Sequence, residues 1–388
     1  TNELNDKPRK DSIVIEEDGK RIEKNEEVAE IFNKFFIEKV TGLRQKIDPS
    51  NQKDPLHPLK MNPPKIKNTL NFKTVSETKV KKIIKRLKNK TSLGEDGISM
   101  KMVKDAANVL SIPLTYIINT SIAESTFPNA WKCAIAVPLF KKKNPLDKQN
   151  YRPVSLLSAS SKVLESVIHD QLYDHFEQNQ LFLKGQHGFQ RNRGTVSALM
   201  TMYAQMSEEF SLGREVACAS FDPSASFDMC EPEILLAKCK LFGLTDKSTI
   251  WLRSFLTNRT QRVRVGQAVS EKRKVPFGCP QGAILSPLAF LIYVSDVDLW
   301  VEKKCHTSYC DDSNIAVSAT TKDLAVQKLE EASQALMTFF ASNFLVANAS
   351  KTTFMVIGRN REDTGFTLKV SGAEIEESKT MEMLGVTL

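Results

Sequence analysis

The stretch 306-HTSYCDDSNIAVS-318 contains a pair of adjacent aspartates between two β-prone runs, and the fold can be worked out starting from this feature. Two β-prone runs, residues 306–309 and 314–318, flank the adjacent acidic residues Asp311 and Asp312. Short strands separated by a few turn residues are typical of an antiparallel hairpin. We therefore expect a β-hairpin that carries two carboxylates at its tip.

Two adjacent carboxylates repel each other, and burying them is costly unless a cation neutralises them. Aspartate oxygens suit Mg²⁺, although a lone acidic pair is more often an exposed turn. A second predicted strand, VACASFD (216–222), ends on Asp222. Three carboxylates meeting at two metal ions about 4 Å apart form a known arrangement for phosphoryl transfer. No nearby cluster of His or Cys favours zinc instead.

Composition narrows the class of protein. The 388 residues are 41% hydrophobic and 26% charged, which predicts a globular protein of two or three subdomains. The net charge of +8 is compatible with a polyanionic partner. Seven cysteines, with no C-x-x-C pair, argue against a disulfide framework and for a reducing, intracellular compartment. No apolar run approaches the ~18 residues that a membrane-spanning segment needs, and no signal peptide is expected before the first domain.

The N-terminal part has its own organisation. Residues 1–25 are polar and predict a tether, and 26-EEVAEIFNKFFIEKV-40 has apolar residues at helical spacing. Residues 48–70 are rich in Pro, Asn and Lys and predict a linker. We therefore expect an N-terminal extension and linker over residues 1–70, followed by the main domain at 71–388.

A helix is expected from about Ser76 to Leu87, where Thr74 and Glu77 have the spacing of a capping box. It carries the densest basic run of the chain: Lys79, Lys81, Lys82, Lys85, Arg86, Lys88 and Lys90. Such a run is either a solvated helix face or a nucleic-acid-binding tract, and the sequence leaves both open.

The remaining elements mix strands and helices without strict alternation. Strands are expected at about 134–140, 262–265, 274–277, 353–357, 366–370 and 380–388, and helices at about 160–178, 232–241, 246–256, 281–296 and 322–342. This order predicts the α+β class.

Nine blocks of this sequence, in this order, resemble the reverse transcriptase of non-LTR (LINE-type) retrotransposons. The blocks are KNKTSLGEDGIS (88–99), FPNAWKCAIAVPLFKKK (127–143), NYRPVSLLSASSKVLE (150–165), QHGFQRNRGTVSAL (186–199), ASFDPSASFDMC (219–230), PFGCPQGAILSPLAFLIYVSDV (276–297), YCDD (309–312), NASKTTFMVIG (348–358) and MLGVTL (383–388). The resemblance extends from about residue 26 to residue 388.

The resemblance implies a right-hand polymerase fold. Fingers are expected at roughly 71–210, and a palm, an antiparallel sheet backed by helices, at roughly 211–388. The N-terminal helical extension precedes them, and the thumb is expected to be absent. The implied activity is RNA-directed DNA polymerase, which extends a DNA 3′-hydroxyl on an RNA template with two Mg²⁺ ions, or Mn²⁺. The implied partners are an RNA template, a DNA primer or target, and dNTPs. The implied location is the nucleus and cytoplasm.

By the same resemblance, Asp222, Asp311 and Asp312 are metal ligands. The backbone carbonyl of Pro223 is a further ligand, at a position where the family usually has an aliphatic residue. Proline keeps this carbonyl but has no N–H, which predicts a weakened strand ladder. Lys351 corresponds to a lysine beside the active site that donates a proton to pyrophosphate; its alternative is an ordinary strand-edge lysine.

Three further residues are expected to contact the incoming nucleotide. The amides of Ala225 and Ser226 would face the triphosphate, since backbone N–H groups commonly bind anions. Phe227 corresponds to the aromatic side chain that crowds a ribose 2′-hydroxyl and selects deoxynucleotides. Its alternative is an ordinary core phenylalanine.

Four more candidates lie in other blocks. Gln281 is expected to hydrogen-bond template or nucleotide, and Gly282 to permit close backbone approach. Arg152 and Lys162 resemble the basic residues that grip the triphosphate, where Arg gives bidentate contacts and Lys a point charge. Exposed basic residues are common in proteins, so the assignment of Arg152 and Lys162 to the triphosphate depends on their positions within the matching blocks.

Two rival functions follow from the same residues. An RNA-dependent RNA polymerase typically has Gly before the acidic pair, whereas this chain has Tyr309-Cys310, and Phe227 also argues against it. The other rival is a catalytically decayed or repurposed nucleic-acid-binding protein. Pro223 favours it, and so does Gln190, which stands where an Arg is frequent. The three aspartates in place favour an enzyme.

Overall fold

The computed structural model falls into two compact units, each built from segments that are distant in sequence. It describes residues 12–302, 306–347, 351–358 and 365–387. The first unit comprises the chain up to Gly42, Asn71–Gln171 and Asp246–Ser286; the second comprises Leu43–Leu70, Leu172–Thr245 and Pro287 onward. The fingers and palm boundaries expected from the sequence stay predictions, because these units are defined by internal contacts rather than by polymerase function.

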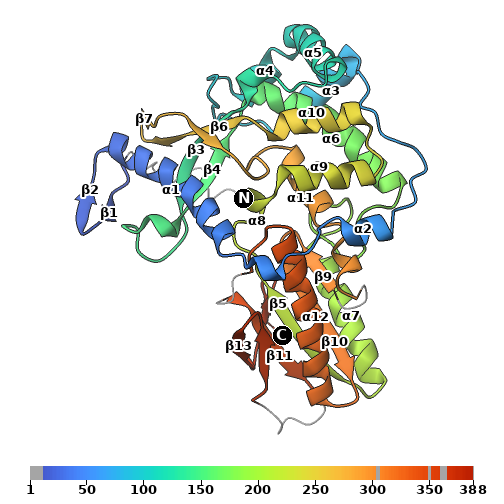
Figure 1. Cartoon of the computed structure of the whole chain (residues 1–388). Helices are drawn as coiled ribbons and strands as arrows, with labels where there is room; N and C mark the ends of the chain where they lie inside the picture. The colour runs from blue at the N-terminus through green and yellow to red at the C-terminus, as the bar shows by residue number, and fades with distance from the viewer. Residues whose placement is uncertain (1–11, 303–305, 348–350, 359–364, 388) are drawn as a thin grey trace. The chain divides into compact units, whose positions relative to one another are not determined.

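The first unit contains a five-stranded sheet in which β4, β3, β6 and β7 are neighbours in that order and β8 pairs with β6 (Figure 1). Its strands are β3 (Cys133–Phe140), β4 (Tyr151–Leu156), β6 (Arg259–Val265), β7 (Ala268–Val269) and β8 (Arg273–Val275). β3 is antiparallel to β4 and parallel to β6. The strands predicted at 134–140, 262–265 and 274–277 are thus confirmed, with ends shifted by a few residues.

Helices complete the first unit. They are α1 (Asn25–Gln45), α3 (Glu77–Arg86), α4 (Met100–Asp105), α5 (Ala107–Ala123), α6 (Ala159–Gln178) and α10 (Asp246–Leu256), of which α1 and α6 continue into the second unit. The predicted capping box is wrong: Ser76 is the N-cap of α3, and Glu77 instead accepts a hydrogen bond from Ser111 at 2.9 Å. In the basic run, Lys79 and Arg86 pair with Asp170 at 3.3 and 3.1 Å.

The prediction of a tether over residues 1–25 is wrong for the part that the structure describes. β1 (Ile15–Glu17) and β2 (Lys20–Ile22) form an antiparallel hairpin. Ile15 is fully buried in a cluster with Phe32 of α1 and Val263 of β6. Ile13 and Ile22 pack against the same cluster, so a few apolar residues in a largely polar segment hold the hairpin to the rest of the core.

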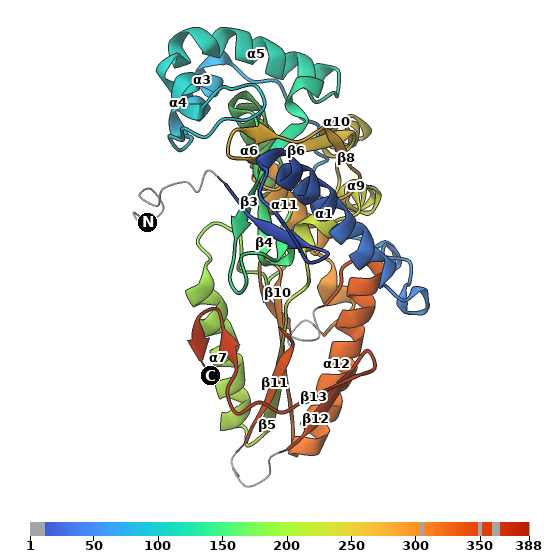
Figure 2. The same cartoon turned by 90° about the vertical axis from the view of Figure 1, so that its left-hand side faces the viewer.

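The second unit is built on a four-stranded antiparallel sheet. In order across the sheet, its strands are β11 (Thr353–Ile357), β5 (Glu215–Phe221), β10 (Asp312–Ala319) and β9 (His306–Tyr309). Figure 2 shows α7 (Thr195–Ser211) and α12 (Lys322–Ser342) on either side of this sheet. β5 is therefore covered on both faces, which explains why its sequence is a continuous run of small and apolar residues. The predicted α+β class, with an antiparallel sheet backed by helices, is confirmed.

The second unit also contains smaller elements. They are α2 (His57–Met61), α8 (Ser226–Met229), α9 (Pro232–Leu241), α11 (Leu285–Tyr293), and the hairpins β12 (Thr367–Val370) with β13 (Ala373–Glu376) and β14 (Glu382–Met383) with β15 (Val386–Thr387). The helix predicted at 281–296 is shorter, because Gly282 at φ 80° forms a turn before it. The predicted linker at 48–70 contains α2, and Leu70 donates a hydrogen bond to Gly243 at 2.8 Å.

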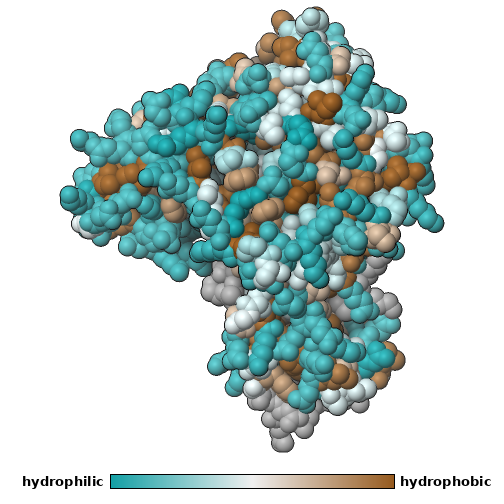
Figure 3. All heavy atoms as spheres, viewed as in Figure 1, coloured by the Kyte–Doolittle hydropathy of each residue, from teal (hydrophilic) through white to brown (hydrophobic). Residues whose placement is uncertain are grey.

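Within the described ranges, every helix is too short or too polar to cross a membrane. The face drawn in Figure 3 is mostly hydrophilic, and its hydrophobic residues form small patches rather than a continuous band.

Candidate functional site

The predicted acidic hairpin is confirmed. Tyr309 of β9 pairs with Asp312 of β10, which leaves Cys310 and Asp311 as a two-residue loop. Cys310 has a φ of 58°, as the first loop residue of such tight turns requires. For a residue other than glycine this conformation costs about 1–3 kcal/mol, and such strain gathers at functional sites.

Sheet pairing brings Asp222 to the same hairpin. The ladder between β5 and β10 ends with Phe221 opposite Ser313. Continuing that register by one residue sets Asp222 opposite Asp312, and residues opposite each other in antiparallel strands lie on the same face about 5 Å apart. Three carboxylates from two distant parts of the chain are therefore gathered at one end of the sheet.

Electrostatics couple the three aspartates. Burial, followed by repulsion from Asp311 and Asp222, raises the pKa of Asp312 to about 6. Burial also raises the pKa of Asp311, opposed by hydrogen bonds from its own backbone and from Ser226, while Asp222 raises it further. The Lys351 ammonium lowers the pKa of both residues. The charged form of this cluster is thus unfavourable unless a cation is near.

Lys351, just before β11, forms an ion pair with Asp222. It is therefore placed beside the carboxylates, as expected from the sequence. Among the residues that the structure describes, no group of three His, Cys, Asp or Glu side chains is close enough to form a complete metal site. Carboxylate oxygens still suit Mg²⁺, because this ion usually takes only one or two carboxylates and completes its shell with water and substrate phosphates.

Pro223 does not end the pairing of its segment. It forms an antiparallel bridge with Ala347, and the next residue, Ser224, donates its N–H to Val346 at 2.8 Å. The weakened ladder expected from the missing N–H is thus offset by the neighbouring residue. The Pro223 carbonyl accepts a hydrogen bond from the Ser226 hydroxyl at 3.1 Å.

The segment after Pro223 turns into α8 through Ala225, whose φ is 53°. Ser226 is 2% exposed, and its hydroxyl is near enough to the Asp311 carboxylate to lower the pKa of that residue. The sequence suggested a role for the Ser226 amide only. Its hydroxyl lies close to both the Pro223 carbonyl and the Asp311 carboxylate, and its single proton can be donated to only one of them at a time.

Phe227 is held between two other aromatic rings. It stacks on Phe290 with ring centres 4.7 Å apart and meets Phe189 edge to face at 6.0 Å. Phe290 is buried, whereas Phe227 is half-buried and Phe189 is 45% exposed. Phe227 is therefore a fixed ring at the edge of the core rather than a residue within it.

The other predicted substrate contacts lie in the first unit and are described there alone. Arg152 is exposed on β4, and Lys162 is partly buried on α6, where burial lowers its pKa. A Cβ added to Gly282 would lie 2.6 Å from the Ser155 carbonyl oxygen, which confirms that the backbones approach closely there. Gln281 precedes this glycine in the same turn.

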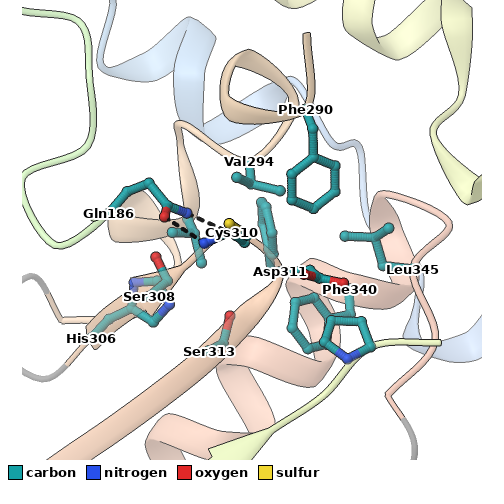
Figure 4. A pocket seen from close by; sticks show the side chains of 13 residues that line it. Gln186, Phe290, Val294, His306, Ser308, Cys310, Asp311, Ser313, Phe340 and Leu345 are labelled. Atoms are coloured by element: carbon teal, nitrogen blue, oxygen red, sulfur yellow. Dashed lines mark hydrogen bonds between the residues drawn. The ribbon is translucent and has the colours of Figure 1, made fainter. Parts of the chain in front are cut away.

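One residue beside the acidic loop was not singled out from the sequence. Gln186 contacts Cys310, and both line a small pocket next to Asp311 (Figure 4). Phe290 and Leu345 lie on the other side of this pocket. The signal that could have found Gln186 is the QHGF block, in which a polar residue precedes a glycine. Residue type alone does not reveal its contact with a loop over a hundred residues away.

The chain matches a family of known proteins over most of its length. Residues 140–388, well over half of it, match the family described as reverse transcriptase (RNA-dependent DNA polymerase). Polymerases of this family generally use divalent metal ions.

Several relatives come from mobile elements of Drosophila melanogaster. The chain is 26% identical over 334 residues to the RNA-directed DNA polymerase from mobile element jockey, with 82% of the chain and 36% of that protein covered. It is 24% identical over 329 residues to the probable RNA-directed DNA polymerase from transposon BS, with the same coverage. The corresponding X-element protein is 28% identical over 225 residues, or 56% of the chain and 24% of that protein.

The chain thus spans about a third of the length of the first two relatives. The family match covers the acidic hairpin, Asp222 and Lys351, the residues that the second unit brings together. The resemblance to non-LTR retrotransposon enzymes is therefore confirmed. The chain belongs to the reverse transcriptase (RNA-dependent DNA polymerase) family.

Proposed function

We propose that this chain contains the polymerase core of a non-LTR retrotransposon reverse transcriptase. It extends a DNA 3′-hydroxyl on an RNA template and takes dNTPs as substrates. The observation that carries the proposal is the convergence of Asp222, Asp311 and Asp312 at one end of an antiparallel sheet. We assign that sheet to the palm and the β3–β4 region to the fingers, after an N-terminal extension.

The metal ligands in this proposal are the three aspartates and the carbonyl of Pro223, with Mg²⁺ as the ion and Mn²⁺ as a substitute. Two bound ions would activate the primer hydroxyl and neutralise the triphosphate and the leaving pyrophosphate. Burial raises the pKa values of Asp311 and Asp312, and repulsion from Asp222 raises both further, which supports a cation as their partner. Mg²⁺ bound by a few carboxylates usually keeps ligand positions for water and substrate oxygens.

The chain's own residues provide the remaining functions. Lys351, already beside Asp222, donates a proton to the leaving pyrophosphate. Phe227, fixed by its two aromatic neighbours, crowds a ribose 2′-hydroxyl. The amides of Ala225 and Ser226 face the triphosphate. In the first unit, Arg152, Lys162, Gln281 and Gly282 are assigned to nucleotide and template contacts.

Primer extension on poly(rA)/oligo(dT) tests the proposal. We compare wild type with Asp311→Ala, and we use Asp323→Ala as a matched control, because Asp323 is an exposed aspartate on α12 of the same unit. Extension is expected to fall to background in Asp311→Ala and to persist in the control. Equal activity in wild type and Asp311→Ala would refute the metal assignment.

The second candidate is a catalytically decayed or repurposed nucleic-acid-binding protein, which the proline at position 223 favours. The hydrogen bond from Ser224 to Val346 reduces the weight of that argument, because pairing continues past the proline. RNA binding with a steep salt dependence, without any nucleotide incorporation, would favour this candidate. Action in the nucleus and cytoplasm stays a prediction from the sequence.

A further inference from the structure

Gln186 uses both ends of its side chain on one residue of the acidic loop. Its Nε2 donates a hydrogen bond to the Cys310 carbonyl at 2.9 Å, and its Oε1 accepts one from the Cys310 N–H at 2.8 Å (Figure 4). The same Oε1 accepts the N–H of Gly188 at 2.7 Å. Gln186 is only 2% exposed, so water does not readily replace these bonds.

The backbone around Gln186 also pairs with the hairpin. Ser308 donates its N–H to Gly185 and accepts that of His187, both at 2.8 Å, which forms a parallel bridge at the outer edge of β9. A Cβ added to Gly185 would lie 2.4 Å from the His306 carbonyl oxygen, and one on Gly188 would lie 2.3 Å from the Cys310 nitrogen. Residues 185–188 therefore lie directly against the strand that leads to the acidic loop.

These contacts bear on the one loop residue with an unfavourable backbone conformation. Cys310 has a φ of 58°, and such a conformation persists only when surrounding contacts hold it. Gln186 satisfies both polar backbone groups of Cys310. The residue that follows is Asp311, so the position of its carboxylate depends on the loop that Gln186 holds.

We propose that Gln186 is a positioning residue that fixes the Cys310–Asp311 loop and thereby sets the affinity of the aspartate cluster for a divalent cation. Gly185 and Gly188 serve the same purpose by letting the segment reach the hairpin. The cation-binding part rests on the proposed function, whereas the clamp on the loop rests on the hydrogen bonds alone.

Gln186→Met tests the proposal, because methionine keeps the length of the side chain but removes both hydrogen-bonding groups. Gln190→Met is the matched control: Gln190 lies in the same loop and bonds only loop carbonyls, that of Gln186 at 2.9 Å among them. Gly188→Ala is a second perturbation, which pushes on the Cys310 backbone from the side. Circular dichroism and melting temperature establish that each variant is folded.

Three measurements follow on the full chain. Hydrogen exchange of the peptide over residues 306–313 reports on the Cys310 amide, and a Mn²⁺ titration followed by electron paramagnetic resonance reports on cation affinity. Primer extension at varied Mg²⁺ gives the concentration for half-maximal rate. We expect faster exchange and a loss of about 10–100-fold in Mn²⁺ affinity in Gln186→Met and Gly188→Ala, as for other residues that orient metal ligands. Gln190→Met should match wild type.

The outcomes separate the two proposals. Unchanged exchange and unchanged Mn²⁺ affinity in folded Gln186→Met and Gly188→Ala would overturn the positioning role. The same losses in Gln190→Met would also overturn it, since the loop as a whole would then be responsible. If wild type extends no primer but its Mn²⁺ affinity depends on Gln186, the positioning role stands and the proposed polymerase activity fails.

Discussion

Lys238 is a fully buried cation whose removal has a predictable cost. Its ammonium donates hydrogen bonds to the Tyr293 carbonyl at 2.7 Å, to Asp296 at 2.6 Å and to the Asn343 side chain at 2.8 Å. The side chains of Lys238 and Asp296 are both 0% exposed. This network joins α9 to the segment after α11 and to the end of α12.

Lys238→Met leaves the Asp296 carboxylate buried without a partner. Breaking a buried ion pair in this way costs about 3–5 kcal/mol, whereas replacing both partners with apolar residues is often neutral. We therefore expect Lys238→Met to lower the free energy of unfolding of the second unit by about 3–5 kcal/mol. The double variant Lys238→Met/Asp296→Leu should recover most of that loss.

The pH dependence of the single variant follows from the same pair. Burial raises the pKa of Asp296, and Lys238 lowers it in turn. Without the lysine, the folded protein binds this proton more tightly than the unfolded chain does. The deficit of Lys238→Met should therefore shrink as pH falls, because the neutral carboxyl is tolerated in the core.

Urea unfolding followed by the fluorescence of Trp300, which lies in the second unit, measures these changes once Trp131 and Trp251 of the first unit are replaced by Phe. Lys369→Met is the matched control, since the Lys369–Glu374 pair is 3.7 Å long and both side chains are 70% exposed. It should stay within about 1 kcal/mol of the parent protein. A Lys238→Met cost no larger than this, or a double variant as unstable as the single one, would refute the reasoning.

Three further predictions concern the candidate site. Phe227→Ala is expected to raise incorporation of rNTPs relative to dNTPs, measured by single-nucleotide extension; an unchanged ratio would assign Phe227 to packing alone. The pKa of Asp312 is raised to about 6, so in metal-free protein the folded state holds this proton more tightly than the unfolded chain does. The free energy of unfolding should therefore fall as pH rises from about 4 to about 6. Asp312→Asn should reduce this slope, to which Asp311 with its raised pKa also contributes, and above pH 6 it should unfold at higher urea than wild type in EDTA. Gly282→Ala should lower the melting temperature, because the φ of 80° disfavours a side chain and the added Cβ would lie 2.6 Å from the Ser155 carbonyl oxygen. An unchanged melting temperature would contradict this close approach of the two backbones.

Much of the second unit could be predicted because its signals are local. The β-prone runs on either side of Asp311 predicted the hairpin, and the apolar run before Asp222 predicted β5. The helix expected at 322–342 is α12 to the residue. In each case the periodicity of side chains along a short segment reflects which faces are buried, so the sequence itself carries the information.

The sequence by itself therefore determined the fold class, the acidic hairpin and the family. Only the tertiary structure decided that Ile15 is a core residue, that Ser224 continues the pairing past Pro223, and that Gln186 holds the Cys310 loop. The physical reason is that these contacts join positions far apart in the chain, and most of them go through backbone N–H and C=O groups. Every non-proline residue has both groups, so no pattern of side chains marks the pairs that will meet.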